Sequence, residues 1–394
     1  MRTILCVATY LKGEAFIREC HARGWSVVLL TADKLADAAW PREAIDEVVT
    51  VTRDPSDQEV RQTVAEIARR RHLDRVAALD DFDVELGATL REFLQLPGFG
   101  RTVAARFRDK LTMRTTARRL GIRVPEFAPL FTDTEIDAWA RRVPPPWVVK
   151  PRSSAAATGI RKVASRDELW PALEALGDRR PDCLIEQFVT GDVYHVDSIV
   201  SNGAVVFAVA SKYGRPPMQI AHDGGVFTTR VMPDDSPEAR PLLEFNQRLL
   251  AGFDLYDGVS HSEYIGAPDG VTFLETSARV GGAYIADVVE TATGVNLWRE
   301  WARLEMAGGD GSYSPPLRRA EYSGIALSLA RQEEPDTSSY TDPEIVARIR
   351  KHHHAGLIVR SRDPHRIETL LSDYAERFSR DFLATMPAPE RPGE

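Results

Sequence analysis

The first part of the chain alternates short apolar runs of strand character with longer amphipathic stretches of helix character. This rhythm constrains the fold strongly, because strands joined through helices form an open, mostly parallel sheet with helices on both faces. The strand-like runs are residues 3–8, 26–31, 47–51 and 75–79, and the helix-like stretches are residues 14–23, 59–71 and 84–94. The turn after the first run, residues 9–13, lacks the glycine spacing of a dinucleotide-binding loop, so we predict no dinucleotide site there.

From about residue 109 the pattern changes to antiparallel strand patterns mixed with helices, which is typical of an α+β arrangement. The helix-like segments are residues 109–120, 132–143, 166–176, 237–252, 283–292 and 297–307, and the strand-like ones are residues 147–150, 183–188, 193–200 and 204–212. At 394 residues the chain is too long for one small core. We therefore expect several domains, ending in a small α+β lobe with strands 321–329 and 356–360, a helix 364–378 and a disordered tail 387–394.

The charge of the chain excludes some partners. The net charge of −8 argues against nucleic acid, whose binding needs a basic face. The basic runs 69–72 and 348–354 lie among helix-like, charged residues, so we interpret them as solvated helix faces. Consecutive residues of a helix point in different directions, so His352, His353 and His354 do not predict a metal site.

The cysteines and the N-terminal apolar run indicate in which cellular compartment the protein is expected. The three cysteines, Cys6, Cys20 and Cys183, are scattered, which argues against a disulfide framework or a zinc site. The apolar run 4–8 is too short for a signal or membrane segment. We expect a cytoplasmic protein without a membrane partner.

Glu263 and Glu275 belong to two neighbouring strand-like runs that are separated by the sequence Gly-Ala-Pro-Asp-Gly, residues 266–270. This composition predicts a hairpin, which would place both carboxylates on one face. Two apposed carboxylates with no adjacent Lys or Arg repel each other and are unfavourable to bury unpaired. A hard divalent cation such as Mg²⁺ takes oxygen ligands, so the pair predicts a magnesium site. For Glu263 alone, a solvated acidic residue is an equal alternative.

A polar string with paired glycines follows the second glutamate directly. It contains Ser277, Arg279, Gly281 and Gly282. Ser277 adds an oxygen near the predicted metal. An arginine beside exposed backbone N–H groups can stabilise a negatively charged intermediate, so we predict a catalytic role for Arg279, Gly281 and Gly282.

Two lysines end strand-like runs. Lys150 precedes a loop of small residues, 153–159, whose N–H groups can cover a phosphate while the lysine supplies a point charge. We expect this loop to be mobile and to close over the site. Lys212 precedes the long loop 215–225 and is a candidate to reach a γ-phosphate, with surface solvation as the equal alternative. Residues 212–229 are expected to help build the acceptor pocket.

In this order and spacing, the motifs resemble those of the ATP-grasp superfamily over about residues 109–309, and the N-terminal region is similar to the domain that precedes them in that family. The resemblance implies ATP as a substrate and Mg²⁺ as its metal. It implies phosphate contacts from Lys110 and Lys150, magnesium ligation by Glu263 and Glu275, and an Arg279 that faces the transferred phosphoryl group. It also implies nucleotide contacts from an adenine hinge and from the phosphate loop, namely Glu186, Gln187, Phe188, Val189, Ser153, Ser154 and Gly159.

The chain departs from the family pattern at three places. Ser277 stands where the family often has Asn, so the number of ions, one or two, stays open, and Mn²⁺ is an alternative metal. The phosphate loop is serine-rich with one late glycine, which resembles the amino-acid ligase branch more than the biotin carboxylase branch. Val193 occupies the region where a ribose-binding carboxylate is common, which leaves Asp192 or His195 as candidates; for His195 a satisfied strand histidine is an equal alternative.

The resemblance implies a division into residues 1–108, an ATP-grasp domain 109–312 with a lid lobe at about 125–190, and a C-terminal lobe 313–394. It implies a carboxylate–amine ligase that forms an amide through an acyl phosphate, with ADP and phosphate as products. Its substrates would be small carboxylates and amines of the amino-acid type, and a homodimer is an open alternative to a monomer. Two other functions stay open: a bicarbonate-activating or carbamoyl-type enzyme, and a non-catalytic nucleotide-binding regulator.

Overall fold

A computed structural model describes residues 1–52, 55–154, 158–267, 270–308 and 312–384. The N-terminal sheet has the strand order β3-β2-β1-β4, and all of its strand pairs are parallel. Its strands are β1 (Thr3–Ala8), β2 (Ser26–Ala32), β3 (Glu47–Val51) and β4 (Arg75–Ala78), joined through α1 (Glu14–Ala22) and α2 (Asp57–Arg70) and followed by α3 (Val84–Leu94). Every residue of β1 and β2 is buried, as expected for a sheet covered on both faces. The predicted βαβ domain is confirmed.

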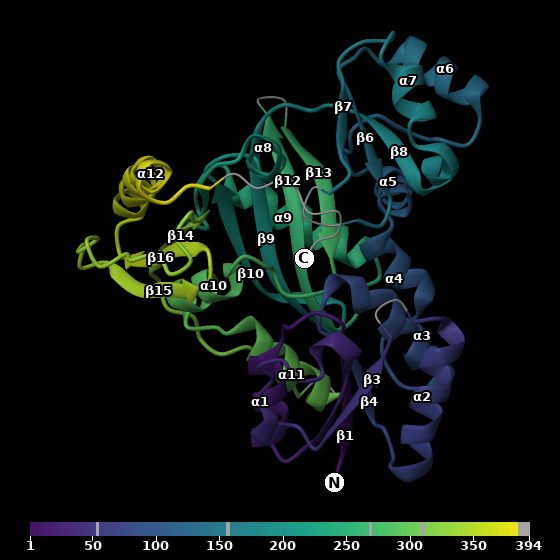
Figure 1. Cartoon of the computed structure of the whole chain (residues 1–394), viewed down its shortest axis with the longest axis vertical. Coiled ribbons are helices and arrows are strands. Elements are labelled where there is room, and N and C mark those ends of the chain that lie inside the picture. The colour runs from purple at the N-terminus through teal and green to yellow at the C-terminus, as the bar shows by residue number, and fades with distance from the viewer. Residues whose placement is uncertain (53–54, 155–157, 268–269, 309–311, 385–394) are drawn as a thin grey trace.

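Two helices lead from this sheet to a small lobe, which lies at the top of Figure 1. The helices are α4 (Arg101–Arg108) and α5 (Lys110–Arg119). The lobe is an antiparallel sheet of order β5-β8-β6-β7 with two helices, and its elements are β5 (Phe127–Pro129), α6 (Asp133–Arg142), β6 (Trp147–Pro151), β7 (Arg161–Val163), α7 (Leu169–Glu174) and β8 (Cys183–Gln187). Its own apolar core is centred on Trp139 and Trp147. Residues 155–157 of the predicted phosphate loop lie outside the described residues.

The largest sheet is antiparallel and has the order β13-β12-β9-β10-β11-β14-β16-β15. Its first five strands are β9 (Asp192–Ser201), β10 (Ala204–Tyr213), β11 (Phe227–Val231), β12 (Gly258–Ala267) and β13 (Gly270–Ser277). The helices between and after them are α8 (Pro217–Asp223), α9 (Ala239–Gly252), α10 (Ile285–Thr293) and α11 (Leu297–Ala307). The core residues show that α9 packs on one face of this sheet while α10 and α11 pack on the other. The predicted hairpin of β12 and β13 is confirmed, although residues 268–269 at its tip lie outside the described residues.

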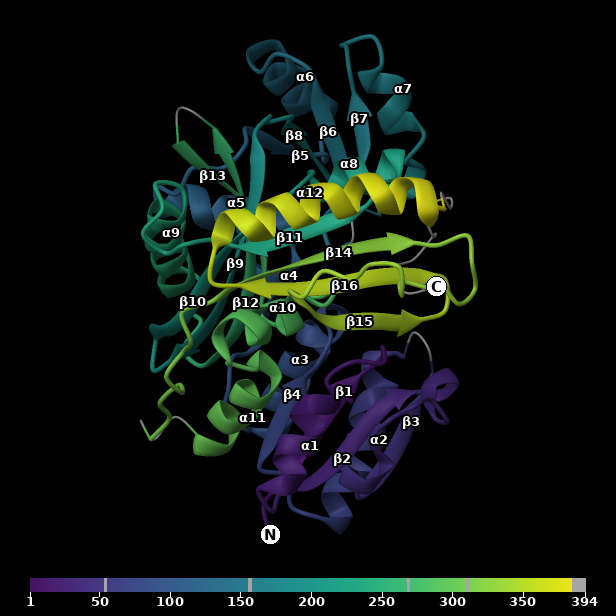
Figure 2. The ribbon, with the colours of Figure 1, turned by 90° about the vertical axis from the view of Figure 1, so that its left-hand side faces the viewer.

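The C-terminal strands extend this same sheet, because β14 pairs with β11. The elements are β14 (Tyr322–Leu329), β15 (Ile345–Lys351), β16 (His354–Ser361) and α12 (Pro364–Asp381). Figure 2 shows α12 lying along the strands, with its apolar side on β14 and β16. Residues 387–394, which were expected to be disordered, lie outside the described residues.

The helix predicted around residues 348–354 is wrong. This stretch is the β15–β16 hairpin, and His353 occupies the left-handed region at its turn with φ 55°. Ile345, Ala347 and Ile349 pack against the apolar cores, whereas Val346 between the first two is 45% exposed, and this alternation of packed and exposed residues is the period of a strand. Within the described part of the chain, no helix is long and apolar enough to cross a membrane.

Candidate active site

A cavity of about 1130 Å³ lies between the small lobe, the large sheet and the N-terminal sheet. Its lining includes most of the residues that the sequence analysis selected: Lys110, Lys150, Ser154, Glu186, Gln187, Phe188, Val189, Glu263, Glu275, Ser277, Arg279 and Gly282. Six selected residues are not in the lining, namely Ser153, Gly159, Asp192, His195, Lys212 and Gly281. The fold therefore gathers segments from three sheets around one cavity.

A buried ionic cluster forms the wall on the side of the small lobe. The antiparallel pairing of β6 with β8 brings Lys150 Nζ within 2.7 Å of Glu186 Oε2, and Arg114 Nε lies 2.7 Å from Glu186 Oε1. Burial lowers the pKa of Lys150 to about 8, although Glu186 opposes this shift. Burial alone would raise the pKa of Glu186, but Arg114 and Lys150 lower it. Both oxygens of Glu186 are thus engaged by cations, so its carboxylate is not available to an adenine edge as the sequence analysis had allowed.

The hinge after β8 lines the cavity beside mainly apolar side chains. Gln187, Phe188 and Val189 line the cavity together with Val148, Ile160 and Leu274. The Phe188 N–H donates to the Pro146 carbonyl at 3.0 Å, which ties the hinge to the small lobe. Lys162 Nζ lies 4.3 Å from the centre of the Phe188 ring. The hinge therefore borders the cavity with an aromatic ring and aliphatic side chains.

The two predicted metal ligands face each other across the hairpin. Glu263 is the register partner of Glu275, so both carboxylates leave the same face of the sheet. Lys110 Nζ lies 3.1 Å from Glu275 Oε2, and the Tyr213 hydroxyl donates to Glu263 Oε1 at 2.7 Å. Burial alone would raise the pKa of Glu275, but Lys110 and Lys150 lower it to about 2. No Lys or Arg is adjacent to either glutamate in the sequence, but in the folded protein Lys110 of α5 contacts Glu275. The expectation that no lysine neighbours this pair is therefore wrong.

This donor set fits a hard divalent cation. Both residues offer carboxylate oxygens, the kind of ligand that Mg²⁺ prefers. Lys110 also donates to the Ser154 carbonyl at 2.5 Å. Lys110 thus contacts both the predicted phosphate loop and the acidic pair. A metal-bound polyphosphate is the chemical group that matches such an arrangement of opposite charges.

Arg279 shares a carboxylate with another arginine. Its Nε lies 3.8 Å from Asp81 Oδ1, and Asp81 is also paired with Arg108. Ser277 donates its hydroxyl hydrogen bond to Asp81 as well. Burial alone would raise the pKa of Asp81, but Arg108 and Arg279 lower it, so the side chain is an anion.

Asp81 was missed as a site residue. It lies in the acidic run 80–83, directly after the carboxyl end of β4. Ligand sites of parallel sheets lie at this edge, so the run was the signal that could have revealed it. Tyr213 and His261 also line the cavity and were not predicted.

Lys212 and Asp192 contact each other away from the cavity. Lys212 Nζ lies 2.6 Å from Asp192 Oδ2 and 5.2 Å from the centre of the Tyr194 ring. Successive residues of a strand point to opposite faces, so Tyr213 faces the cavity and Lys212 does not. The placement gives no support to a γ-phosphate contact by Lys212 or to a ribose contact by Asp192.

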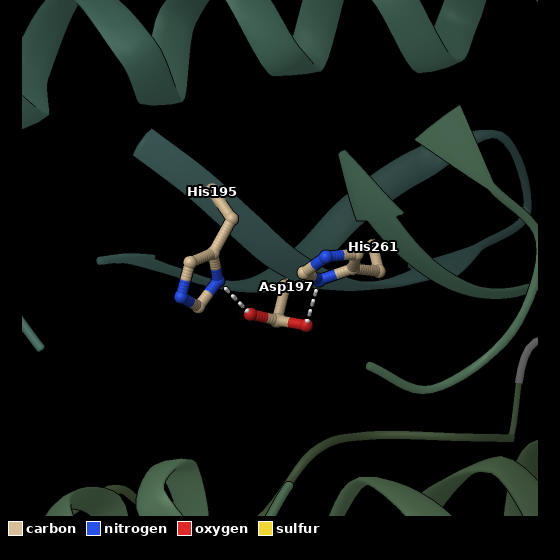
Figure 3. A group of neighbouring side chains, drawn as sticks. All are labelled: His195, Asp197 and His261. Carbon is tan, nitrogen blue, oxygen red and sulfur yellow. Dashed lines mark hydrogen bonds and ion pairs between the residues drawn. The ribbon is translucent and has the colours of Figure 1, made fainter. Parts of the chain in front are cut away.

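His195 is part of a buried cluster with Asp197 and His261 (Figure 3). The two carboxylate oxygens of Asp197 lie 2.7 Å from His195 Nδ1 and 2.9 Å from His261 Nδ1. His195 Nε2 lies 2.7 Å from Thr229 Oγ1, so His195 is a satisfied strand histidine rather than a ribose contact. Burial alone would lower the pKa of His261, but Asp197 raises it to about 9.

The paired glycines have different surroundings. A Cβ atom on Gly281 would lie 2.9 Å from Asp197 Oδ1 and 3.0 Å from His261 Nδ1. A Cβ atom on Gly282 would meet nothing within 4 Å. Gly281 therefore lets the segment pack on the buried cluster, while Gly282 lines the cavity.

The wall opposite the small lobe is largely apolar. Tyr213 and Phe227 pack ring against ring, with centroids 5.6 Å apart, at the ends of β10 and β11. The helix α8, which the sequence analysis placed in a loop, adds Met218, Ile220 and Ala221 to the lining. Gln219 and Asp223 are the polar residues that this helix contributes. Because Tyr213 also contacts Glu263, this apolar wall adjoins the acidic pair.

Comparisons with known proteins agree with this architecture. Residues 17–98 match the ATP-grasp N-terminal domain family, and residues 107–253 match the ATP-grasp domain family. The chain is 24% identical over 259 residues to the L-arginine-specific L-amino acid ligase of Bacillus subtilis, which covers 64% of this chain and 62% of the relative. It is 33% identical over 105 residues to the D-alanine–D-alanine ligase of Neisseria gonorrhoeae, which covers 26% of this chain and 34% of the relative.

The chain thus spans less than two thirds of the length of either curated relative. Among solved structures, the L-amino acid ligase of Bacillus licheniformis superposes with a TM-score of 0.75 at 17% identity. The superposition covers 97% of this chain and 98% of that structure. At this identity the likeness shows a shared fold over nearly the whole chain.

Proposed function

Since the chain belongs to the ATP-grasp superfamily, we propose that it is an ATP-dependent carboxylate–amine ligase that joins two amino acids. ATP phosphorylates a substrate carboxylate, and the amine of the second substrate then displaces phosphate from the acyl phosphate to leave an amide. A carboxylate is a poor electrophile, and the phosphoryl group supplies the leaving group. The observation that carries the proposal is the meeting of Lys110, Lys150, Glu263 and Glu275 at one cavity.

The residues have distinct roles in this proposal. Gln187, Phe188 and Val189 hold the adenine by their backbone and apolar surface, and Lys110 and Lys150 bind phosphate oxygens. Glu263 and Glu275 hold Mg²⁺, which neutralises phosphate charge when it is bound. Ser277 donates its hydroxyl hydrogen to Asp81, and its oxygen lone pairs are still available to a metal, so this contact does not set the number of ions. In-line transfer of a phosphoryl group from one oxygen to another needs correct positioning of the reactants and compensation of their negative charge. It does not need a protein nucleophile.

Arg279 is placed to act on the charge that develops at the reacting centre. Its guanidinium forms an ion pair with Asp81, which is also paired with Arg108. Gly282 also lines the cavity, and in this proposal its backbone N–H adds a neutral donor. Together they stabilise the acyl phosphate and the tetrahedral species that follows. Enclosure of the cavity excludes water, which would hydrolyse an acyl phosphate.

At least one substrate carries an apolar side chain in this proposal. The wall made by Phe227, Met218 and Ile220 adjoins the acidic pair, so it lies next to the end of the nucleotide that reacts. Burial of an apolar side chain there is favourable, whereas a charged side chain would lose hydration without an ionic partner on most of this wall.

A matrix of amino-acid pairs, scored by phosphate release and product mass, tests the proposal. We expect phosphate and a dipeptide with Met, Leu or Phe in one position, and little product when both substrates are Lys, Arg, Asp or Glu. ADP release that depends on bicarbonate and not on any amino acid would favour a bicarbonate-activating enzyme instead. Nucleotide binding without ADP formation across the whole matrix would favour a regulator.

A further inference from the structure

We propose that Tyr213 and four buried side chains behind it, His261, Asp197, His195 and Thr229, hold the Glu263 carboxylate in the orientation that presents its second oxygen to a divalent cation. These five side chains are called the anchoring chain below. The inference rests on the proposed function, since it takes Glu263 as a metal ligand.

The first link of the anchoring chain engages one oxygen of Glu263. The Tyr213 hydroxyl donates to Glu263 Oε1 at 2.7 Å, and His261 Nε2 lies 3.6 Å from the same oxygen and 3.5 Å from the Tyr213 hydroxyl. Glu263 Oε2 has no hydrogen bond or ion pair to any of the described residues. The carboxylate is thus fixed through one oxygen while the other stays available on the cavity side.

The anchoring chain then continues beneath the cavity. His261 Nδ1 lies 2.9 Å from Asp197 Oδ1, Asp197 Oδ2 lies 2.7 Å from His195 Nδ1, and His195 Nε2 lies 2.7 Å from Thr229 Oγ1. Thr229 in turn donates to the Lys212 carbonyl at 3.3 Å. The members belong to β12, β9, β10 and β11, four adjacent strands.

This network is rigid because it is buried and its members satisfy each other. Asp197 is 0% exposed, and His195 and Thr229 are each 1% exposed. Buried polar groups that are fully paired stay in one arrangement, since any other arrangement would leave a donor or acceptor without a partner. Residues that orient a metal ligand in this way change metal affinity when they are removed, typically by about ten- to a hundredfold.

The carboxylate of Glu275 is held in a different way from that of Glu263. Its carboxylate is paired with Lys110, whose long side chain comes from α5 outside the sheet. Glu263 is instead bonded to a stiff aromatic side chain of its own sheet. We therefore infer that Tyr213 acts as a positioning residue for the metal site and not as a reacting group.

The test compares two tyrosine variants that each lose a short hydroxyl hydrogen bond to another side chain. Tyr213→Phe removes the bond to Glu263, while Tyr264→Phe removes a bond of equal length, 2.7 Å, from Tyr264 to Asn246 Oδ1. Tyr264 adjoins Glu263 in sequence but packs in the core on the α9 face of the sheet. Binding of Mn²⁺ in the presence of ADP is measured by the electron spin resonance signal of free Mn²⁺, with thermal unfolding in parallel.

We expect Tyr213→Phe to weaken Mn²⁺ binding by about tenfold or more, and Tyr264→Phe to leave it within about twofold at a similar loss of melting temperature. The metal concentration needed for half-maximal ATP turnover should rise in step, with amino-acid KM values unchanged at saturating metal. Thr229→Val, at the far end of the anchoring chain, should weaken Mn²⁺ binding in the same direction by a smaller factor.

Equal Mn²⁺ affinities for wild type and Tyr213→Phe would overturn the inference and leave the proposed function standing. An equal loss in both tyrosine variants would also overturn it, because it would show a general effect of destabilisation. If the wild type binds no Mn²⁺ with ADP, the metal assignment of the proposed function falls, and the inference falls with it.

Discussion

Glu263 on β12 lies directly opposite Glu275 on β13, and each carboxylate is held by a donor from a different part of the chain. Lys110 from α5 holds Glu275, whereas Tyr213 from β10 holds Glu263. The pair is thus brought together by a local hairpin, but its charge is balanced by distant elements.

Replacing Glu275 with Gln should reduce ADP formation at least a hundredfold, because an amide is a far weaker ligand for Mg²⁺ than a carboxylate. The fold should survive, since the substituted side chain keeps its size and lines a cavity. Steady-state ADP release and thermal unfolding check both parts. Glu333→Gln, at a carboxylate that is 70% exposed, serves as the control. Turnover near the wild-type rate in a folded Glu275→Gln variant would remove the metal assignment.

The pH dependence of ATP use should report the charge of Lys150. Burial lowers the pKa of this lysine to about 8, so it is positive below that pH and neutral above it. A neutral amine binds phosphate poorly, and kcat/KM for ATP should therefore fall as the pH rises through about 8. In Lys150→Arg the guanidinium stays charged, so this decline should be absent up to about pH 10. Identical profiles for the two proteins would show that another group titrates.

Lys150→Ala should lower kcat/KM for ATP at least tenfold at pH 7, equivalent to about 1.4 kcal/mol of transition-state stabilisation. The change also leaves Glu186 with Arg114 as its remaining cation, so unfolding is followed as well. Lys351→Ala, at an exposed lysine on the distant β15–β16 hairpin, is the control. If the kinetics of Lys150→Ala equal those of the wild type, Lys150 has only a structural role.

The two glycines of the 281–282 pair should respond differently to a methyl group. Gly281→Ala places a Cβ atom against Asp197 and His261 and should destabilise the fold by about 1–3 kcal/mol, the range typical of overpacking. Gly282→Ala meets open space and should change the free energy of unfolding by less than about 0.5 kcal/mol. Urea unfolding of both variants measures the difference. Equal stabilities would mean that the segment can shift away from the buried cluster.

Nucleotide should protect the hinge. Residues 187–189 line the cavity, so amide hydrogen exchange there should slow when a non-hydrolysable ATP analogue and Mg²⁺ are added. The helix α12 packs on the far part of the large sheet and should exchange at the same rate with and without nucleotide. If the nucleotide does not change the rate of amide hydrogen exchange in the hinge, the adenine binds elsewhere.

Local patterns in the sequence predicted much of this fold. The strands β1 and β3, the helices α3 and α11, and the β12–β13 hairpin were all indicated by apolar period and turn composition. The strand predicted at residues 356–360 is confirmed as part of β16, but the stretch 348–354 was misread as helical, because its arginines and histidines concealed the alternation of Ile345, Ala347 and Ile349. Short elements such as α4, α8 and β11 carry too few residues to show a period.

Local pattern alone brought together the site residues that are neighbours in the chain, whereas Lys110 and Glu186 were selected through the family resemblance and Asp81 was missed. Glu263 and Glu275 lie twelve positions apart on one hairpin, so their meeting follows from local structure. For Lys212 a γ-phosphate contact and surface solvation were equal alternatives, and the sequence did not choose between them; a shift of one residue along a strand reverses the side chain, so the cavity is lined by Tyr213 instead. The contribution of Asp81 depends on how the N-terminal sheet docks, which no local pattern encodes.

The bond between Ser277 and Asp81 joins residues 196 positions apart, one from the large sheet and one from the N-terminal sheet. Before these two sheets dock, Arg108 and Arg279 cannot both pair with the Asp81 carboxylate. The order of events in refolding follows from this dependence: secondary structure and the nucleotide slot can form within their own units, but the reacting end of the cavity is complete only after docking. We therefore expect enzymatic activity to be the last property regained when the unfolded chain is returned to native conditions, which makes it the most sensitive reporter of a fully assembled molecule.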